Sequence, residues 1–117
     1  MEMRCEHLES REEGDVVVAR INPESSATTT FEDIAAEILS LIKTTQCQKI
    51  LINLQHVEYL QSTGLGGLVL LEKTMAATQG QLRLCGLSSA VEELFQLTGL
   101  DNVFNIRKDE EDGLSDF

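Results

Sequence analysis

Tryptophan is absent from the sequence, and aromatic residues of all kinds make up only 4% of its 117 residues. The core must therefore consist mainly of Leu, Ile, Val and Ala, and hydrophobic residues do account for 42% of the chain. A chain of this length falls within the usual size of one domain. It buries roughly two thirds of the surface that its unfolded form exposes, so it needs no disulfide to fold. We expect one domain over residues 1–117.

Positive charge is also scarce. Nine Lys and Arg residues stand against 20 Asp and Glu residues, which gives a formal net charge of −11. Nucleic-acid binding needs clustered Lys and Arg, and so does attachment to an anionic membrane surface. The composition therefore predicts no nucleic-acid partner and no direct membrane binding. The negative charge suits solubility, or a basic patch on a partner protein.

The cysteines and histidines are few and far apart. Cys5, Cys47 and Cys85 are odd in number and form no C-x-x-C pair, so they predict reduced thiols rather than a disulfide framework. We interpret Cys47 and Cys85 as small core residues. His7 and His56 are isolated and predict no metal site. We also see no apolar segment of the kind found in a signal peptide or a membrane span, and we expect a cytoplasmic protein without a cofactor.

Apolar residues recur with strand and helix periods in alternation along most of the chain. The spacing of Phe31, Ile34, Ala35 and Ile38 predicts an amphipathic helix. The apolar run 49–54 indicates a central strand that is covered on both faces, as in a parallel sheet. We expect strands within 3–21 (two, around a turn at 12–15), 49–54, 81–87 and 102–108, helices at 31–43, 63–79 and 88–100, and a last helical turn in 109–117. Gly80 is expected at the C′ position of the second helix and Gly99 at the end of the third. The alternation predicts an α/β fold with right-handed crossovers.

The stretch EYLQSTGLGGLVLLEK, residues 58–73, places two hydroxyls and three glycines in front of an apolar run. It is not a phosphate-binding loop, because no Lys follows the glycines, and the spacing G-x-G-G does not match a dinucleotide fingerprint. It also lacks the first glycine of a G-x-S-x-G nucleophile elbow. Two interpretations remain open. The hydroxyls can cap the helix, or Ser62 can accept a phosphoryl group at the positive end of the helix dipole.

Residues 49–73 and 80–106, with the strand pair before them, resemble the STAS domain, and more closely the stand-alone anti-sigma factor antagonists of bacteria. In that family an apolar strand and a short loop precede D-S-[ST]-G-L-G, a helix, a glycine, a strand, and a helix that ends in Thr-Gly-Leu or Ser-Gly-Leu. This sequence supplies 62–66, Gly80 and 97–101. The resemblance covers roughly residues 5–108 and leaves an acidic tail at 109–117.

The resemblance implies a single STAS-like domain with a four- or five-stranded mixed sheet and helices packed mainly on one face. It implies a non-enzymatic regulator that binds an anti-sigma factor, itself a serine kinase of the histidine-kinase-like ATPase fold. Phosphorylation by that kinase dissociates the complex, and a metal-dependent serine phosphatase removes the phosphate so that the complex can form again. The matching acceptor is Ser62, with Thr63 as the adjacent hydroxyl and helix cap. The implied partner-binding residues are Asn22, Glu24, Ser25, Glu58, Gln61, Ser62, Thr63, Gly64, Leu65 and Gly66.

Two positions depart from the family pattern. Gln61 replaces the usual Asp before the acceptor, and residues 21–25 replace a glycine-containing turn that touches the partner in the family. These departures favour a divergent interface. They also motivate an alternative function, a STAS scaffold or accessory subunit of a signalling or transport complex without a phosphorylation switch. Nucleotide binding is a third hypothesis. Tyr59 suits either a partner anchor or a core residue, and we interpret it as core.

Overall fold

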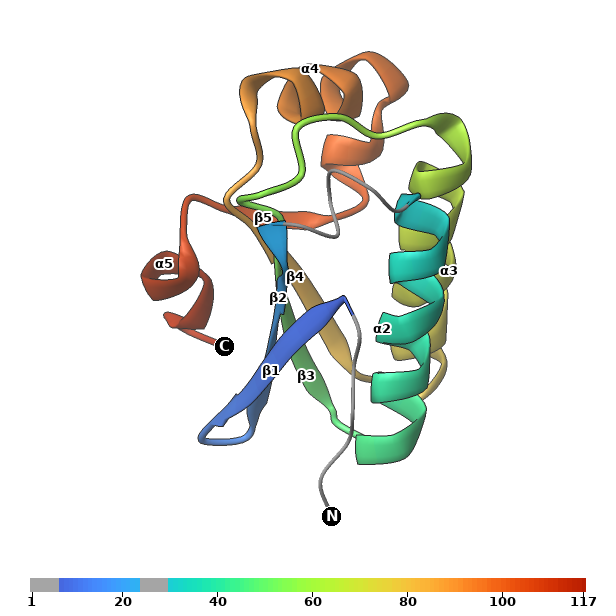
Figure 1. The fold of residues 1–117 in the computed structure, drawn as a ribbon. Helices are drawn as coiled ribbons and strands as arrows, with labels where there is room; N and C mark the ends of the chain where they lie inside the picture. Colours follow the sequence, from blue (N-terminus) through green and yellow to red (C-terminus); the bar gives the residue numbers. More distant parts are fainter. Residues whose placement is uncertain (1–6, 24–29) are drawn as a thin grey trace.

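A five-stranded sheet crosses the molecule in the strand order β1-β2-β3-β4-β5 (Figure 1). The computed structural model describes residues 7–23 and 30–117. The strands are β1 (Leu8–Glu13), β2 (Val16–Ile21), β3 (Lys49–Asn53), β4 (Gln81–Cys85) and β5 (Asn105–Arg107). β1 pairs antiparallel with β2, and β2 to β5 pair in parallel. The expected mixed sheet is confirmed, with five strands.

The two long helices lie together on one face of this sheet, and a short helix lies on the other (Figure 1). α2 (Phe31–Thr45) and α3 (Ser62–Ala77) form the pair, and α5 (Glu110–Leu114) is the short helix. α4 (Ser89–Thr98) and the 3-10 helix η1 (Leu100–Asn102) follow β4 near the carboxyl edge of the parallel strands. Helices packed mainly on one face were expected, and this is confirmed.

The core confirms the predicted central strand. Ile50 and Ile52 of β3 are fully buried in the main core against the helices, and Leu51, between them, is fully buried on the opposite face. Burying one such side chain contributes roughly 1.5–3 kcal/mol. The amphipathic pattern of α2 is confirmed as well, because Ile34, Ala35 and Ile38 are buried.

The end of α3 differs from the prediction. The left-handed residue is Gln79 (φ 61°), whose N–H donates to the Ala76 carbonyl at 3.0 Å, while the Gly80 N–H donates to the Met75 carbonyl at 2.8 Å. This is a Schellman motif with Gln79 at C′, so the placement of Gly80 at C′ was wrong. Gly80 is needed for space, because a Cβ there would lie 3.0 Å from the Gln48 carbonyl oxygen. Gly99 (φ 76°) ends α4 as predicted.

Residues 109–117, the acidic segment, cover the second face of the sheet, the face opposite α2 and α3 (Figure 1). Leu114 and Phe117 pack there against Val16, Val18, Leu51 and Cys85. The sequence predicted an acidic tail with a final helical turn. The turn is confirmed as α5, and the structure adds that the segment is docked on the sheet.

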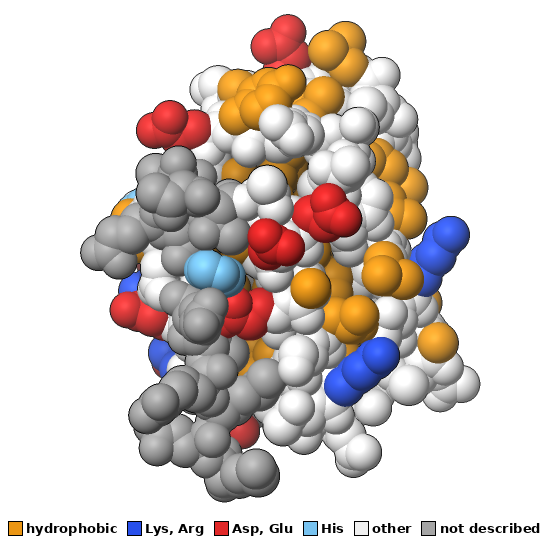
Figure 2. Space-filling model, turned by 45° about the vertical axis from the view of Figure 1, so that its right-hand side comes forward, with side chains coloured by type: hydrophobic (Ala, Val, Ile, Leu, Met, Phe, Trp, Pro, Cys, Tyr) orange, Lys and Arg blue, Asp and Glu red, His pale blue; other side chains and the backbone are white. Residues whose placement is uncertain are grey.

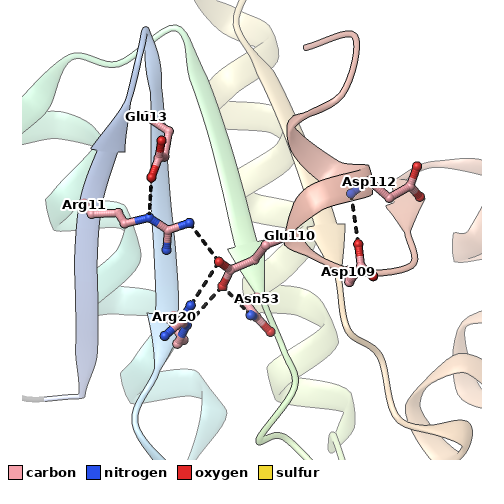
Figure 3. Close-up of polar contacts among 7 residues, drawn as sticks. All are labelled: Arg11, Glu13, Arg20, Asn53, Asp109, Glu110 and Asp112. Carbon is pink, nitrogen blue, oxygen red and sulfur yellow. Dashed lines mark hydrogen bonds and ion pairs between the residues drawn. The ribbon is translucent and has the colours of Figure 1, made fainter.

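Glu110 holds the start of the acidic segment (Figure 3). Its carboxylate accepts hydrogen bonds from Arg20 (Nε and Nη2, both 3.0 Å), from Arg11 Nη2 (2.8 Å) and from Asn53 Nδ2. The bonds from Arg20, together with those from Asn53 and Arg11, lower the pKa of Glu110 to about 2, although partial burial opposes the shift. The network therefore stabilises the ionised carboxylate.

This pKa predicts how stability depends on pH. The folded pKa of Glu110 lies below its ordinary value of 4.5. The contribution, up to about 3 kcal/mol, is therefore fully present above about pH 5 and is lost as the pH falls towards 2. Urea unfolding should show wild type more stable than Glu110→Gln at pH 7, with the difference nearly unchanged at about pH 5 and clearly smaller at about pH 3. Glu111→Gln, at an exposed position, is the control. A difference that stays constant with pH would contradict the prediction.

Candidate functional site

The loops that follow β2 and β3 leave the sheet at the same edge, because these strands are parallel. Asn22 follows β2 and is half-buried, and residues 54–61 follow β3. The two helices that these loops enter meet at their first turns, where a Cβ added at Gly64 would lie 3.1 Å from the Cβ of Phe31. Glu24 and Ser25, two of the predicted partner-binding residues, lie outside the described residues.

The loop 54–61 is held in place on both sides. Leu54, Val57 and Leu60 are buried, and the Leu54 N–H donates to the Cys85 carbonyl at 2.9 Å. The Ser88 hydroxyl donates to the Glu58 carbonyl at 3.2 Å and also accepts the Val91 N–H at 3.2 Å, where it caps α4. The path of the chain into Ser62 is thus fixed by buried anchors.

Tyr59 is 71% exposed, so its interpretation as a core residue was wrong. The apolar neighbours Val57 and Leu60 already occupy the buried positions of the loop, and Tyr59 is left at the surface. Leu97, at the end of α4, is also exposed. Figure 2 shows hydrophobic and acidic side chains interspersed on the side of the molecule that carries α2 and α3.

Ser62 and Thr63 are exposed in the first turn of α3, at its first and second positions. Gln61 is the N-cap residue, with extended backbone angles (φ −85°, ψ 168°) and no capping bond from its side chain. The prediction that Thr63 caps the helix was therefore wrong. A cap must precede the helical angles, and Thr63 already has them.

The backbone at this helix start can receive an anion. The first helical bond joins the Leu65 N–H to the Gln61 carbonyl at 3.1 Å, so the amides of Ser62, Thr63 and Gly64 have no partner within the helix. The first turn contains no acidic residue that would offset the positive end of the helix dipole. A phosphoryl group on the Ser62 hydroxyl would thus meet free N–H donors.

The three glycines have different roles. Gly64 and Gly67 face α2, and a Cβ at Gly67 would lie 2.8 Å from the Cβ of Ala35. A Cβ at Gly66 would meet nothing within 4 Å. Gly66 is exposed and lies one turn after Ser62, on the same side of the helix. Two glycines therefore allow α3 to pack closely on α2. The third, Gly66, leaves no side chain projecting from the surface beside Ser62.

Of the other predicted partner-binding residues, Glu58 and Gln61 are exposed, together with Ser62, Thr63 and Gly66. Leu65 and Gly64 are buried beneath them. Within residues 7–23 and 30–117, no group of three or more His, Cys, Asp and Glu residues is placed to hold a metal ion. Over the same residues, no helix is long and apolar enough to cross a membrane.

Comparison with known proteins gives consistent matches. A family model described as the STAS domain matches residues 7–113. The anti-sigma-B factor antagonist of Staphylococcus aureus is 31% identical over 72 residues, which are 62% of this chain and 67% of that protein. An anti-sigma-factor antagonist (STAS) domain protein from Planctomyces limnophilus is 27% identical, with a TM-score of 0.80 over 92% of this chain and 94% of that one. The Bacillus cell fate determinant SpoIIAA in its phosphorylated form is 21% identical and similar in fold, with a TM-score of 0.61 over 89% and 94% of the two chains.

Proposed function

Because the chain belongs to the STAS domain family and, within it, to the anti-sigma factor antagonists, which are non-enzymatic regulators, we propose that phosphorylation of Ser62 controls its binding to an anti-sigma factor. In this proposal the partner is a serine kinase of the histidine-kinase-like ATPase fold. The unmodified chain binds it in the cytoplasm. Transfer of the γ-phosphoryl group of ATP to the Ser62 hydroxyl releases ADP, and the complex dissociates. A metal-dependent serine phosphatase removes the phosphate and restores binding.

The observation that carries the proposal is the setting of Ser62. Its side chain is exposed at the first position of α3, beside three amides without helical partners and one turn from the bare surface of Gly66. A kinase must bring its bound ATP close to the acceptor hydroxyl, and a missing side chain at Gly66 gives it room to approach. The buried anchors of the loop 54–61 hold the backbone that carries the hydroxyl.

Phosphorylation at this position changes the surface without requiring a change of fold. The phosphoserine carries about −1.5 to −2 charges at pH 7 and is stabilised by the helix start. A partner surface that packs against an uncharged hydroxyl must then bury an unpaired charge, which is unfavourable. Exposed groups around it, among them Gln61 and Tyr59, supply the polar and apolar contacts of the unmodified complex.

We expect phosphate on Ser62 when the protein is isolated from its own cells, in an amount that differs between growing and stressed cells. Peptide mass spectrometry locates it. In vitro, with the kinase-type anti-sigma factor and ATP, Ser62→Ala should lose phosphorylation, whereas Thr63→Ala, which removes the adjacent exposed hydroxyl, should keep it. Phosphate on Thr63 alone, or none under any condition, would argue against the proposed switch.

A second candidate function is favoured by Gln61, which places no carboxylate before the acceptor, and by the altered segment 21–25. In this alternative the chain is a STAS scaffold, or an accessory subunit of a signalling or transport complex, that is never phosphorylated. Neighbouring genes distinguish the two. Genes for a sigma factor and a small kinase support the phosphorylation switch, and genes for transporter components support the alternative.

A further inference from the structure

The positive charge of this acidic chain is concentrated on the second face of the sheet. Five of its nine Lys and Arg residues contact the acidic segment there: Arg11, Arg20, Lys49, Arg83 and Arg107. The acidic segment itself contains five Asp and Glu residues among its nine positions. On the opposite side, which Figure 2 brings forward, Lys and Arg side chains are few and scattered. The face and the segment are therefore complementary in charge.

Three contacts define how the face recognises the segment. The Glu110 carboxylate is held by Arg11, Arg20 and Asn53 (Figure 3). Gly113 lies directly on Leu51, because an added Cβ would come within 2.6 Å of Leu51 Cδ1. The third contact is made by Arg83, which binds the last residues of the segment.

Arg83 is only 5% exposed and projects from β4 under the segment. Its guanidinium donates to the carbonyl oxygens of Gly113 (2.9 Å), Ser115 (2.6 Å) and Asp116 (2.9 Å), and the Phe117 ring centroid lies 4.2 Å from its Cζ. Lys49 Nζ donates to the Phe117 carbonyl oxygen at 2.9 Å. Desolvation lowers the pKa of Arg83. The buried positive charge of Arg83 is thus stabilised by the carbonyl groups and the aromatic ring of the segment.

The segment depends on the face in turn. α5 has five residues and contains a glycine, and a helix this short does not persist alone in water. The contacts described above run from the segment to the sheet, so the face orders the segment as a receptor orders a flexible peptide that folds on binding.

We propose that the second face of the sheet is a peptide-binding surface which the acidic segment occupies as an intramolecular ligand, and which binds an acidic segment of a partner protein when its own segment is released. The chemistry of the bound segment defines that partner: a carboxylate, a glycine three residues later, and an aromatic side chain four residues after the glycine, as in Glu110, Gly113 and Phe117. The positive charge of the surface favours an acidic partner segment of this kind. The surface lies on the face opposite α2 and α3, so this inference is independent of phosphorylation at Ser62.

Cys85 reports whether the face is covered. Its side chain is fully buried in the cluster under the acidic segment, and burial raises the pKa of its thiol to about 12. Release of the segment exposes the thiol and removes the desolvation, so iodoacetamide should react faster. Peptide mass spectrometry follows Cys85 separately from Cys47, which is half-buried outside this face and serves as the internal standard.

Gly113→Ala should release the segment, because its new Cβ overlaps with the fully buried Leu51 side chain. We expect alkylation of Cys85 to become at least about tenfold faster while Cys47 is unaffected. A synthetic peptide with the sequence of residues 109–117 should then restore protection in proportion to its concentration. The same peptide with alanine in place of its glycine should not protect.

A matched charge pair provides the second variant. Glu110→Gln and Glu111→Gln each remove one negative charge, but only Glu110 lies in the arginine network, and Glu111 is exposed. Only Glu110→Gln should accelerate alkylation of Cys85. Wild-type reactivity of Cys85 in both Gly113→Ala and Glu110→Gln would overturn the proposal, as would equal acceleration at Cys47 or a peptide that gives no protection. If a variant protects Cys85 by forming a dimer in which two copies exchange their acidic segments, the surface binds a second copy of this chain. That result would overturn the proposal that it binds a partner protein.

Discussion

The variant Gly67→Ala will be less stable than the variant Gly66→Ala by about 1–3 kcal/mol, although the two substitutions are one residue apart in the same helix. A Cβ at Gly67 would lie 2.8 Å from the Cβ of Ala35 on α2, and a Cβ at Gly66 would meet nothing within 4 Å. The gain that alanine gives over glycine inside a helix applies at both positions and cancels in the comparison. The difference therefore measures the packing of α3 on α2.

Urea unfolding of wild type and both variants tests this prediction. Gly66→Ala should match wild type or exceed it by up to about 1 kcal/mol, because the substitution reduces the freedom of the unfolded chain without a clash. Equal stabilities of the two variants would show that the helices separate without cost, and would contradict the packing described here. The same pair gives a functional contrast, because only Gly66 is at the surface beside Ser62.

If Ser62 controls partner binding as proposed, Ser62→Asp will weaken binding to the kinase-type anti-sigma factor by about 100-fold, or about 2.7 kcal/mol. The reason is the cost of burying an unpaired carboxylate in the proposed interface, which is complementary to a hydroxyl. The stability of the free chain should not fall, because an acidic side chain in the first turn of α3 interacts favourably with the helix dipole. Isothermal titration calorimetry measures the affinity, and urea unfolding the stability.

Ser62→Asn is the matched control for that experiment, since Asn has nearly the same shape as Asp and no charge. We expect it to lose much less affinity than Ser62→Asp. If the two variants lose equal affinity, the shape of the side chain rather than its charge sets the binding. If Ser62→Asp binds as tightly as wild type, a negative charge at Ser62 does not control the partner.

The periodic elements could be predicted from the sequence because each one follows a single physical rule. The buried stripe of α2 follows from helical spacing, and the central position of β3 follows from its continuous apolar run. The predicted start of α3 at Thr63 was one residue late. Residue preferences alone cannot decide which of three polar residues, Gln61, Ser62 or Thr63, takes the extended cap angles.

The errors fall where long-range contacts decide. Tyr59 could not be placed from its own apolar character, because Val57 and Leu60 compete with it for the same interior. Gly80 was assigned a backbone role, but its close neighbour is the carbonyl of Gln48, which is remote in sequence. The acidic segment appears in the sequence as a solvated tail, and nothing local indicates that Arg11 and Arg20 will meet Glu110.

The candidate site was predicted in part. The motif around Ser62 brings the candidate acceptor and the neighbouring glycines together, because residues 62–66 are contiguous, and the role of Ser62 as acceptor stays a prediction. It does not distinguish Gly66, which is open, from Gly67, which packs on Ala35, since that difference depends on the angle between two helices. The contact from Ser88 to the Glu58 carbonyl joins two loops thirty residues apart in the sequence and could not be foreseen.

The strand order of the sheet has a consequence for synthesis on the ribosome. Because β1 to β5 neighbour one another in the order in which they are translated, each strand that emerges finds its pairing edge already formed, and no strand must insert between two others. Such a chain can fold from its amino-terminal end as it grows. Residues 109–117 emerge after β5. Until they dock, the apolar cluster of Val16, Val18, Leu51 and Cys85 on the second face is exposed, and a nascent chain that stalls after β5 would present it to chaperones.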